Sequence, residues 1–293
     1  MSQSPATLAD LRRRLDSIDE RLLDLLMERA RAMEDVRAAK NAAEGPNAKL
    51  GRPGRELAIL RRLVARIQGP LPPGLVVRIW RDIMTSFTRL QGAFSIAVWD
   101  SNANANANSA GGSLMGLARR HYGQATPLLP ASSPAQAIAR LDDARAQLAL
   151  LPVPEDAPEL NWWRNLSPTG LQVLARLPVD GQETQPGAFV VGRQPFEESG
   201  ADRGLLIVAA EIQASRAKLI QLLVNAGFAP IGIIAEMAVA GHPLFLVVNE
   251  TYVGSADARM AALAANGLRA VVAGGYGVPL GLASEPSSKG VRA

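Results

Sequence analysis

The chain of 293 residues contains no cysteine, only two histidines and few aromatic residues, which make up 4% of it. The absence of cysteine excludes disulfide bonds and thiolate chemistry and fits a reducing compartment. His121 and His242 are isolated in the sequence, and two histidines without cysteine make no convincing metal site. We therefore expect no bound metal ion.

The sequence also lacks a long uninterrupted hydrophobic run. Its most apolar stretch, 226–248, contains Glu236, His242, two prolines and three glycines, so we expect no membrane span. The first residues, Met-Ser-Gln-Ser-Pro-Ala-Thr, lack the basic and then apolar order of a signal peptide. We expect a cytoplasmic protein without a membrane partner.

Charge is distributed unevenly along the chain. Residues 1–92 carry 17 Lys and Arg against 11 Asp and Glu, whereas the remainder carries 14 against 16. The net charge of +6 in the first segment favours an anionic partner. Its arginines at 13, 14, 61, 62 and 66 fall mostly on solvated helix faces without interleaved aromatic residues, so we expect a small anion and no nucleic acid.

Three helices are expected in the first 92 residues. Apolar residues at alternating spacings of three and four predict one amphipathic helix over 8–41, with Thr7 as its N-cap. This helix would extend about 50 Å, farther than a 90-residue domain is wide, so we expect it to bury its apolar stripe on a second copy of itself. Two further helices are predicted over 53–67 and 75–91.

Beyond Gly92 the pattern changes to alternating strands and helices. An α/β lobe is expected from a strand at 94–99, helices at 114–122 and 133–141 and a strand at 147–151, with Trp162-Trp163 as a packing anchor. Between 202 and 274 the order strand–helix–strand–strand–helix–strand predicts a ferredoxin-like module. We expect a mobile loop at 102–112. The predicted fold class is multidomain α plus α/β, with an all-helical domain (1–92), an α/β lobe (93–200), a ferredoxin-like module (201–283) and a disordered tail (284–293).

Several charged residues fall inside the predicted apolar stripes. At about 100° per residue, Arg29 and Lys40 lie on the apolar face of the first helix, and Glu56 lies on that of the second, with Arg55 beside it. A buried ion pair of Glu56 with Arg29 or Lys40 is one explanation. However, Arg29, Lys40 and Arg55 outnumber the single carboxylate of Glu56, and an unpaired buried charge is costly. A small dianion that binds between them explains the surplus positive charge better.

The order Leu11-Arg12, Ile18-Asp19, Leu22-Leu23, Leu26, Arg29, Lys40, Arg55-Glu56 and Gln91 resembles the all-helical chorismate mutase family over about 85 residues. The resemblance implies an intertwined homodimer that rearranges chorismate to prephenate in aromatic amino-acid biosynthesis, with two sites built from both chains. The resemblance also implies a role for each site residue. Arg29, Arg55 and the partner chain's Arg12 would bind the substrate's carboxylates, and Arg52 would belong to the same substrate-binding group. Lys40 and Gln91 would contact the ether oxygen, and Glu56 would contact the ring hydroxyl.

This pericyclic reaction moves no proton and needs no cofactor. The protein has to fold the substrate into its reactive conformer and stabilise charge developing on the ether oxygen. The sequence departs from the family pattern at Arg52, where an acidic residue is common, and at Phe87, which aligns with a serine that helps to bind a carboxylate.

The remainder resembles the bifunctional mutase–prephenate dehydratases, whose last module is an ACT regulatory domain. The dehydratase's Thr-Arg-Phe motif aligns with Gly187-Ala188-Phe189, which supplies no hydroxyl. The dehydratase's Val-Pro-Ile-Glu-Asn stretch aligns with Leu151–Glu155, where the carboxylate stands at a different position. We therefore expect no dehydratase activity. The module also lacks the family's effector motifs, which favours a scaffold role over ligand sensing.

Two other functions stay open at this point. An isochorismate-pyruvate lyase shares the helical fold and a similar cationic site. A non-catalytic protein that senses amino acids or binds a partner is also compatible with the order of domains.

Overall fold

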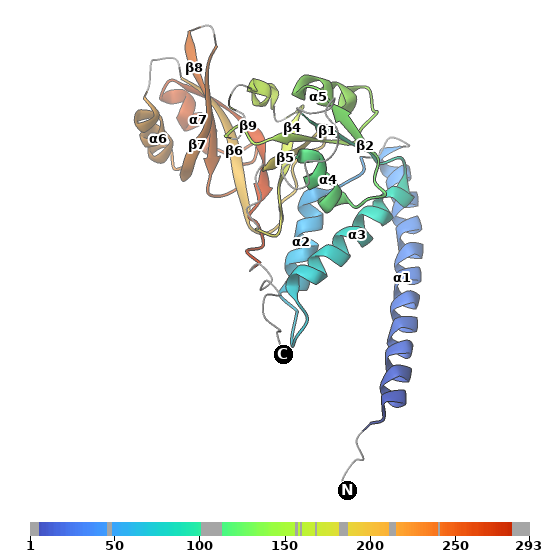
Figure 1. Cartoon of the computed structure of the whole chain (residues 1–293). Coiled ribbons are helices and arrows are strands. Elements are labelled where there is room, and N and C mark those ends of the chain that lie inside the picture. The colour runs from blue at the N-terminus through green and yellow to red at the C-terminus, as the bar shows by residue number, and fades with distance from the viewer. Residues whose placement is uncertain are drawn as a thin grey trace. The chain divides into compact units, whose positions relative to one another are not determined.

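The structure is a computed structural model that describes residues 6–45, 49–100, 113–155, 158, 160–167, 169–181, 187–210, 215–239 and 241–282 (Figure 1). The chain divides into two compact units. The first comprises Met1–Leu50 and Phe87–Ala93, and the second comprises Gly51–Ser86 and Phe94–Ala293. The predicted fold class, α plus α/β in several parts, is confirmed.

Helix α1, Leu8–Glu44, makes up most of the first unit. The predicted cap is confirmed: the Thr7 hydroxyl accepts a hydrogen bond from the backbone N–H of Asp10 (3.2 Å), and the Asp10 carboxylate accepts one from the backbone N–H of Thr7 (3.0 Å). The helix ends at Gly45, whose φ of +77° favours glycine. Its apolar stripe is exposed along most of its length, with Leu15 61% and Leu22 53% accessible.

Helix α2, Pro53–Val64, and most of helix α3, Pro73–Gln91, belong to the second unit. Pro53 stands at the first helical position, where its missing N–H costs no hydrogen bond. Leu57 and Leu60 of α2 are buried, 4% and 2% accessible. Both helices occur where they were predicted, although α2 ends three residues earlier.

One nine-stranded sheet forms the centre of the second unit, in the order β2-β1-β3-β5-β4-β9-β6-β8-β7. Strand β1 pairs in parallel with β2 and β3, whereas β5 is antiparallel to β3 and β4. The elements of this half are β1 Ile96–Trp99, α4 Leu114–Tyr122, β2 Leu128–Ala131, α5 Pro134–Asp142, β3 Leu148–Pro152, the 3₁₀ helix η1 Asn161–Asn165, β4 Gln172–Leu177 and β5 Ala188–Gly192.

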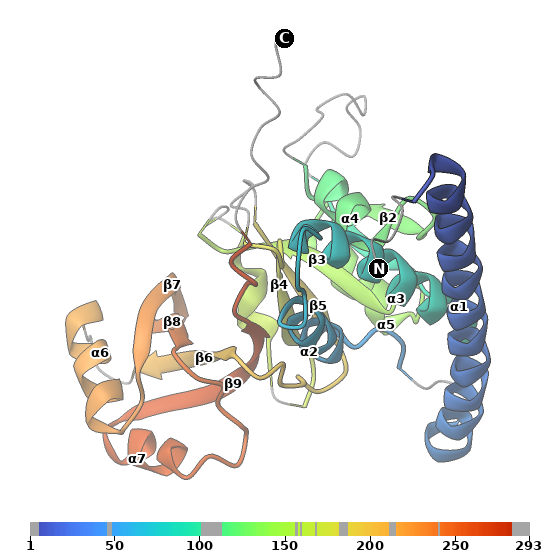
Figure 2. The ribbon, with the colours of Figure 1, turned by 90° about the horizontal axis from the view of Figure 1, so that it is seen from below.

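The predicted ferredoxin-like order is confirmed in the other half of the sheet. Its strands are antiparallel in the order β9-β6-β8-β7, and α6 and α7 cover one face (Figure 2). Ser215 caps α6 by accepting a hydrogen bond from the N–H of Lys218 (3.2 Å). The elements are β6 Asp202–Ala210, α6 Arg216–Asn225, β7 Pro230–Val239, β8 His242–Asn249, α7 Arg259–Ala265 and β9 Leu268–Gly277.

The two halves of the sheet share one hydrophobic core. Alternate residues of β6 face opposite sides, so Leu206 and Val208 pack under α6 and α7, whereas Leu205 and Ile207 join Trp163 and Phe189 in a cluster that extends through the lobe. The halves meet where β4 and β9 pair in parallel, at Val173 and Gly274. The lobe and the module are therefore continuous in both sheet and core.

Three strands of the lobe, β2, β4 and β5, were missed in the sequence. Trp162 and Trp163 are buried, which confirms their packing role, and the Trp162 indole donates to the carbonyl of Pro152 (3.1 Å). The predicted loop at 102–112 and the tail at 284–293 lie outside the described residues. The domain boundaries at 92/93 and 200/201 stay predictions.

Helix α2 begins in close contact with the segment that connects β5 to β6. A Cβ atom on Gly54 would overlap the backbone carbonyl of Glu197, an atom that cannot rotate away. Only glycine fits at this crossing.

We expect Gly54→Ala to lower the free energy of unfolding by about 1–3 kcal/mol because the added methyl forces the two backbones apart. Alanine has a higher helix propensity than glycine and would by itself stabilise α2. A lower free energy of unfolding in Gly54→Ala would therefore come from the contact with Glu197. Urea denaturation measures it. Gly254→Ala, where nothing lies within 4 Å of the added Cβ, is the matched control. Equal stabilities of the two variants would show that the crossing is loose.

Candidate functional site

Arg29 and Gln91, two predicted site residues of the first unit, both contact Phe87. The Arg29 guanidinium carbon lies 4.4 Å from the centroid of the Phe87 ring, a cation–π contact. The Gln91 amide lies 3.4 Å from the Phe87 carbonyl and 3.6 Å from the Met33 sulfur. Phe87, at the position of the family serine, thus offers Arg29 a ring face instead of a hydroxyl.

Arg29 is half-buried on the apolar side of α1, as the helical periodicity predicted. Burial lowers the pKa of its guanidinium. Its Nη1 is buried and has no hydrogen-bond partner among the residues that the structure describes. None of the ion pairs between described residues includes Arg29. A guanidinium in this state has donors to spare for an anion.

Lys40 and Arg12 differ in burial. Lys40 is half-buried, three turns beyond Arg29 on α1, whereas Arg12 is exposed near the start of the helix. The partial burial of Lys40 agrees with the predicted periodicity, which put it on the apolar face of the helix.

Glu56 occupies the first turn of α2 in the second unit. Its carboxylate turns back to the backbone N–H of Arg52, at 3.4 Å from Oε1. Burial raises the pKa of Glu56, the Arg52 N–H opposes this, and the negative charge of Glu197 raises it further. A helix N-terminus normally favours a carboxylate, so desolvation is the stronger effect here.

Arg52 and Arg55 flank Glu56, and both are exposed. Arg52 forms an ion pair with Glu197, with Nε 2.6 Å from Oε1 and Nη2 on the same oxygen. Arg55 takes part in no ion pair between described residues.

A cluster of polar residues near Glu56 was missed in the sequence. His121 and Tyr122 of α4 are buried, and His121 Nδ1 lies 3.3 Å from Arg81 Nη1 of α3. Burial and the charge of Arg81 hold the pKa of His121 well below its ordinary value, and burial and Glu56 raise that of Tyr122. These residues carry no spacing pattern with α2, because only the fold brings α4 to it.

The predicted site residues fall into two groups. Arg12, Arg29, Lys40 and Gln91 belong to the first unit, whereas Arg52, Arg55 and Glu56 belong to the second. Their convergence in one site stays a prediction, as does the alternative ion pair of Glu56 with Arg29 or Lys40.

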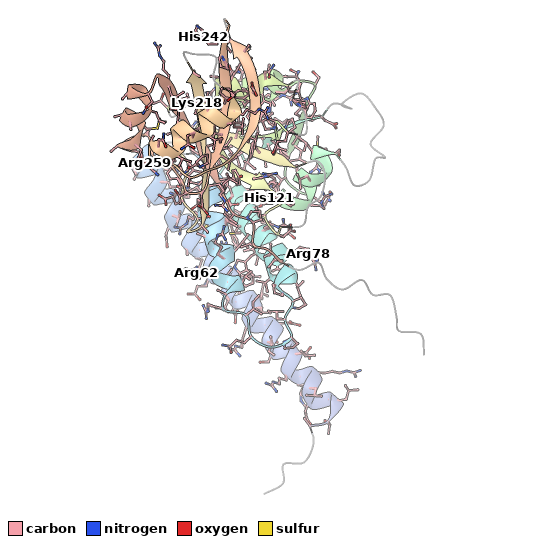
Figure 3. The ribbon with its side chains drawn as sticks, turned by 90° about the vertical axis from the view of Figure 1, so that its left-hand side faces the viewer. Arg62, Arg78, His121, Lys218, His242 and Arg259 are labelled. Carbon is pink, nitrogen blue, oxygen red and sulfur yellow. The ribbon has the colours of Figure 1, made fainter. Side chains whose placement is uncertain are left out.

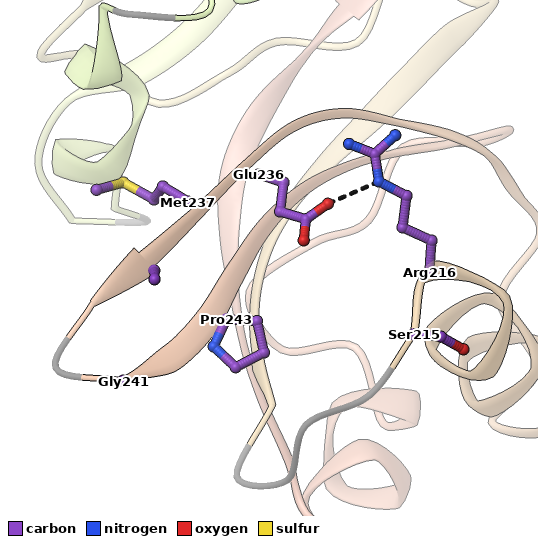
Figure 4. Close-up of a pocket in the computed structure, with 7 residues that line it drawn as sticks. Ser215, Arg216, Glu236, Met237, Gly241 and Pro243 are labelled. Atoms are coloured by element: carbon purple, nitrogen blue, oxygen red, sulfur yellow. Dashed lines mark hydrogen bonds and ion pairs between the residues drawn. The ribbon is translucent and has the colours of Figure 1, made fainter.

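A separate hollow of about 730 Å³ lies in the ferredoxin-like half between the start of α6 and the β7–β8 hairpin (Figure 4). An ion pair crosses it, with Arg216 Nε 2.6 Å from Glu236 Oε2. None of the predicted site residues lines it.

No group of three side chains suited to a metal ion occurs among the described residues. His121 is buried on α4, and His242 is exposed at the start of β8 (Figure 3). In the same described part of the chain, every helix is too short or too polar to cross a membrane.

Residues 11–92 match the family model described as chorismate mutase type II, which confirms the resemblance predicted for residues 8–92. Two curated proteins are similar over 92 residues. The "Bifunctional chorismate mutase/prephenate dehydratase" of Pseudomonas aeruginosa is 39% identical, and that of Stutzerimonas stutzeri is 38% identical. Each match covers 31% of this chain and 25% of the relative. The chain thus spans about a quarter of the length of these relatives.

Among solved structures, an X-ray structure of prephenate dehydratase from Streptococcus mutans covers 64% of this chain and 99% of that chain, with a TM-score of 0.45 and 14% identity. At this level the likeness carries no conclusion about the reaction.

The raised pKa of Glu56 makes stability depend on pH. The fold favours the neutral form, so the stability that Glu56 contributes is present below its unfolded pKa and is lost as pH rises through its folded pKa. We expect Glu56→Gln to be more stable than the wild type at neutral pH and to lose this advantage in acid. Urea denaturation across the pH range measures the difference. Glu34→Gln, at an exposed position of α1, is the control. Parallel profiles for both variants would show that Glu56 is solvated.

Proposed function

We propose that residues 8–92 catalyse the rearrangement of chorismate to prephenate without a cofactor. The observation that carries the proposal is Arg29, a half-buried guanidinium with an unsatisfied donor and no carboxylate beside it among the described residues. The match of residues 11–92 to the chorismate mutase type II model supports the same reaction.

The residues divide the work by their chemistry. Arg29 and Arg55 bind the two carboxylates of chorismate through bidentate hydrogen bonds, completed by Arg12 from a second chain. Lys40 and Gln91 donate to the ether oxygen, where negative charge develops as the C–O bond breaks. Holding the substrate in its compact conformer supplies the rest of the acceleration.

Glu56 contacts the ring hydroxyl of the substrate. Its raised pKa favours the neutral carboxyl, which does not repel a dianion and can donate a hydrogen bond. Arg52 adds to the positive potential, but Glu197 already compensates its charge, so we expect a smaller contribution to binding from Arg52 than from Arg55.

The active form is a homodimer. Exposed leucines along α1 form an apolar stripe far longer than a soluble monomer normally leaves in water. A second α1 covers such a stripe most simply, and it also brings the partner's Arg12 to the site.

The C-terminal two-thirds serves as a scaffold and has no dehydratase activity. Ala188 and Phe189, at the place of the dehydratase's Thr-Arg-Phe, are buried in β5 and offer no hydroxyl. The cytoplasmic location and the absence of membrane and nucleic-acid partners stay predictions.

Lys40→Ala should lower kcat for chorismate at least about a hundredfold, because a preorganised donor to the developing oxyanion is lost. The loss of chorismate absorbance measures the rate. Lys49→Ala is the matched control, since Lys49 is exposed beyond the end of α1. Equal rates for Lys40→Ala and the wild type would refute the role of Lys40.

Product analysis in the same assay separates the alternatives. Prephenate from chorismate supports the mutase, whereas pyruvate from isochorismate would identify a lyase. Phenylpyruvate would reveal dehydratase activity. No turnover of either substrate, with a ligand-dependent thermal shift, would favour a sensor.

A site shared between chains can be tested by mixing two inactive variants. In a heterodimer of Arg12→Ala and Lys40→Ala, one of the two sites recovers every wild-type residue, so random exchange should restore about a quarter of wild-type activity. Arg29→Ala mixed with Lys40→Ala is the control, because both residues come from one chain and no site is repaired. Recovery in both mixtures, or in neither, would contradict the shared site.

A further inference from the structure

We infer that Glu197 is a positioning residue for the mutase reaction: it holds Arg52 and thereby fixes the first turn of α2, from which Arg55 and Glu56 reach the substrate. The inference rests on the proposed function. It assigns a part in that reaction to a residue more than 100 positions beyond the last residue matched by the mutase family model.

The contact between Glu197 and Arg52 is specific in its geometry. One carboxylate oxygen of Glu197 accepts from Nε of Arg52 at 2.6 Å and from Nη2 as well. Arg52 is the residue that precedes the first turn of α2, and its backbone N–H faces the Glu56 carboxylate. Glu197 is therefore connected to Glu56 through a single intervening residue, Arg52, in addition to the direct repulsion between the two carboxylates.

Glu197 is itself held in place by its neighbours in sequence. Phe196 is buried, and its N–H donates to Gln172 of β4 at 3.0 Å. On the other side, the N–H and the hydroxyl of Ser199 both donate to the Asp202 carboxylate, at 2.7 and 2.6 Å. Because the backbone on both sides of Glu197 is fixed, ordering its side chain costs less entropy than forming a typical surface ion pair does.

The connection from β5 to β6 also fixes the backbone at the start of α2. The Gln194 amide donates to the carbonyl of Gly51 at 2.7 Å, and the carbonyl of Glu197 lies against Gly54. These two contacts bracket Arg52. The Arg52–Glu197 ion pair is thus one of several contacts that attach the start of α2 to the β5–β6 connection.

The same attachment continues along α2. Arg61 donates through Nη2 to the carbonyl of Ala201 at 3.0 Å and to that of Val278. Arg62, the next residue, is exposed (Figure 3). At Gly277 of β9 a Cβ would overlap the side chain of Leu57. Helix α2 is therefore attached to the segment before β6 and to the end of β9 as well as to the β5–β6 connection.

Electrostatics gives this contact a consequence for Glu56. The groups that interact with Glu56 are the backbone N–H of Arg52 at the N-cap of α2, the carboxylate of Glu197 on the β5–β6 connection and the phenol of Tyr122 on α4. Removing the charge of Glu197 withdraws a repulsion from Glu56 and leaves Arg52 uncompensated. Both changes lower the pKa of Glu56 and favour its ionised form.

The test is Glu197→Gln in the full chain, which keeps the shape of the side chain and removes its charge. We expect kcat/KM for chorismate to fall about three- to fivefold, the scale of a well-formed ion pair, because loss of the fixed first turn outweighs the attraction gained when the charge of Arg52 is no longer compensated. Ionised Glu56 would repel the dianionic substrate, so we expect activity to fall as pH rises through the pKa of Glu56, and we expect this fall to occur at lower pH in Glu197→Gln. Glu197→Asp should recover part of the activity. Asp142→Asn, which breaks the Arg193–Asp142 pair elsewhere in the second unit, is the matched control.

A double-mutant cycle tests whether Glu197 acts through Arg52. In an Arg52→Gln background, Glu197→Gln should have little additional effect on kcat/KM at acid pH, where Glu56 is neutral and the direct repulsion from Glu197 plays no part. A wild-type protein that does not convert chorismate overturns the proposed function and this inference with it. An active wild type in which Glu197→Gln behaves like Asp142→Asn, with an unshifted pH profile, overturns the positioning role alone.

Discussion

The candidate site depends on one constraint: some of its charged side chains are partly removed from water without an opposite charge beside them. A charged group that leaves water needs an opposite charge, a set of hydrogen bonds or a change of protonation. Arg29 has none of its donors on a described carboxylate, and Glu56 faces one long backbone contact. Burial shifts the pKa of each toward the neutral form. Each residue is therefore suited to an external partner: an anion for Arg29 and a hydrogen-bonding group for Glu56.

Helix α2 links this constraint to the rest of the molecule. By sequence it belongs to the mutase segment, which the family model matches over residues 11–92. By packing it belongs with the large sheet, since Leu57 lies against the end of β9 and Arg61 donates to the carbonyls of Ala201, just before β6, and of Val278, just after β9. The environment of Glu56 is consequently set by residues far along the chain.

The sequence predicted the elements that depend on local periodicity and capping. Thr7 was identified as a cap, and the strand–helix order of 202–274 was correct, because hydroxyl caps and apolar spacing are local signals. Strands β4 and β5 were missed because they are short and buried on both faces, which removes the alternation that marks a strand. The burial of Arg29 followed from helix geometry. The Arg52–Glu197 pair did not, because 145 positions separate its members.

The continuity of α2 with the sheet has a consequence for the history of such chains. Two modules joined end to end can be lost or exchanged separately, provided that each covers its own apolar surface. Here a chain cut after residue 92 would leave Leu57 and Leu60 without their cover, at about 25 cal/mol for each Å² returned to water. A helix that is packed into its neighbour's core in this way couples the stability of the two parts, so a change in the C-terminal part can affect the helix whatever else that part does.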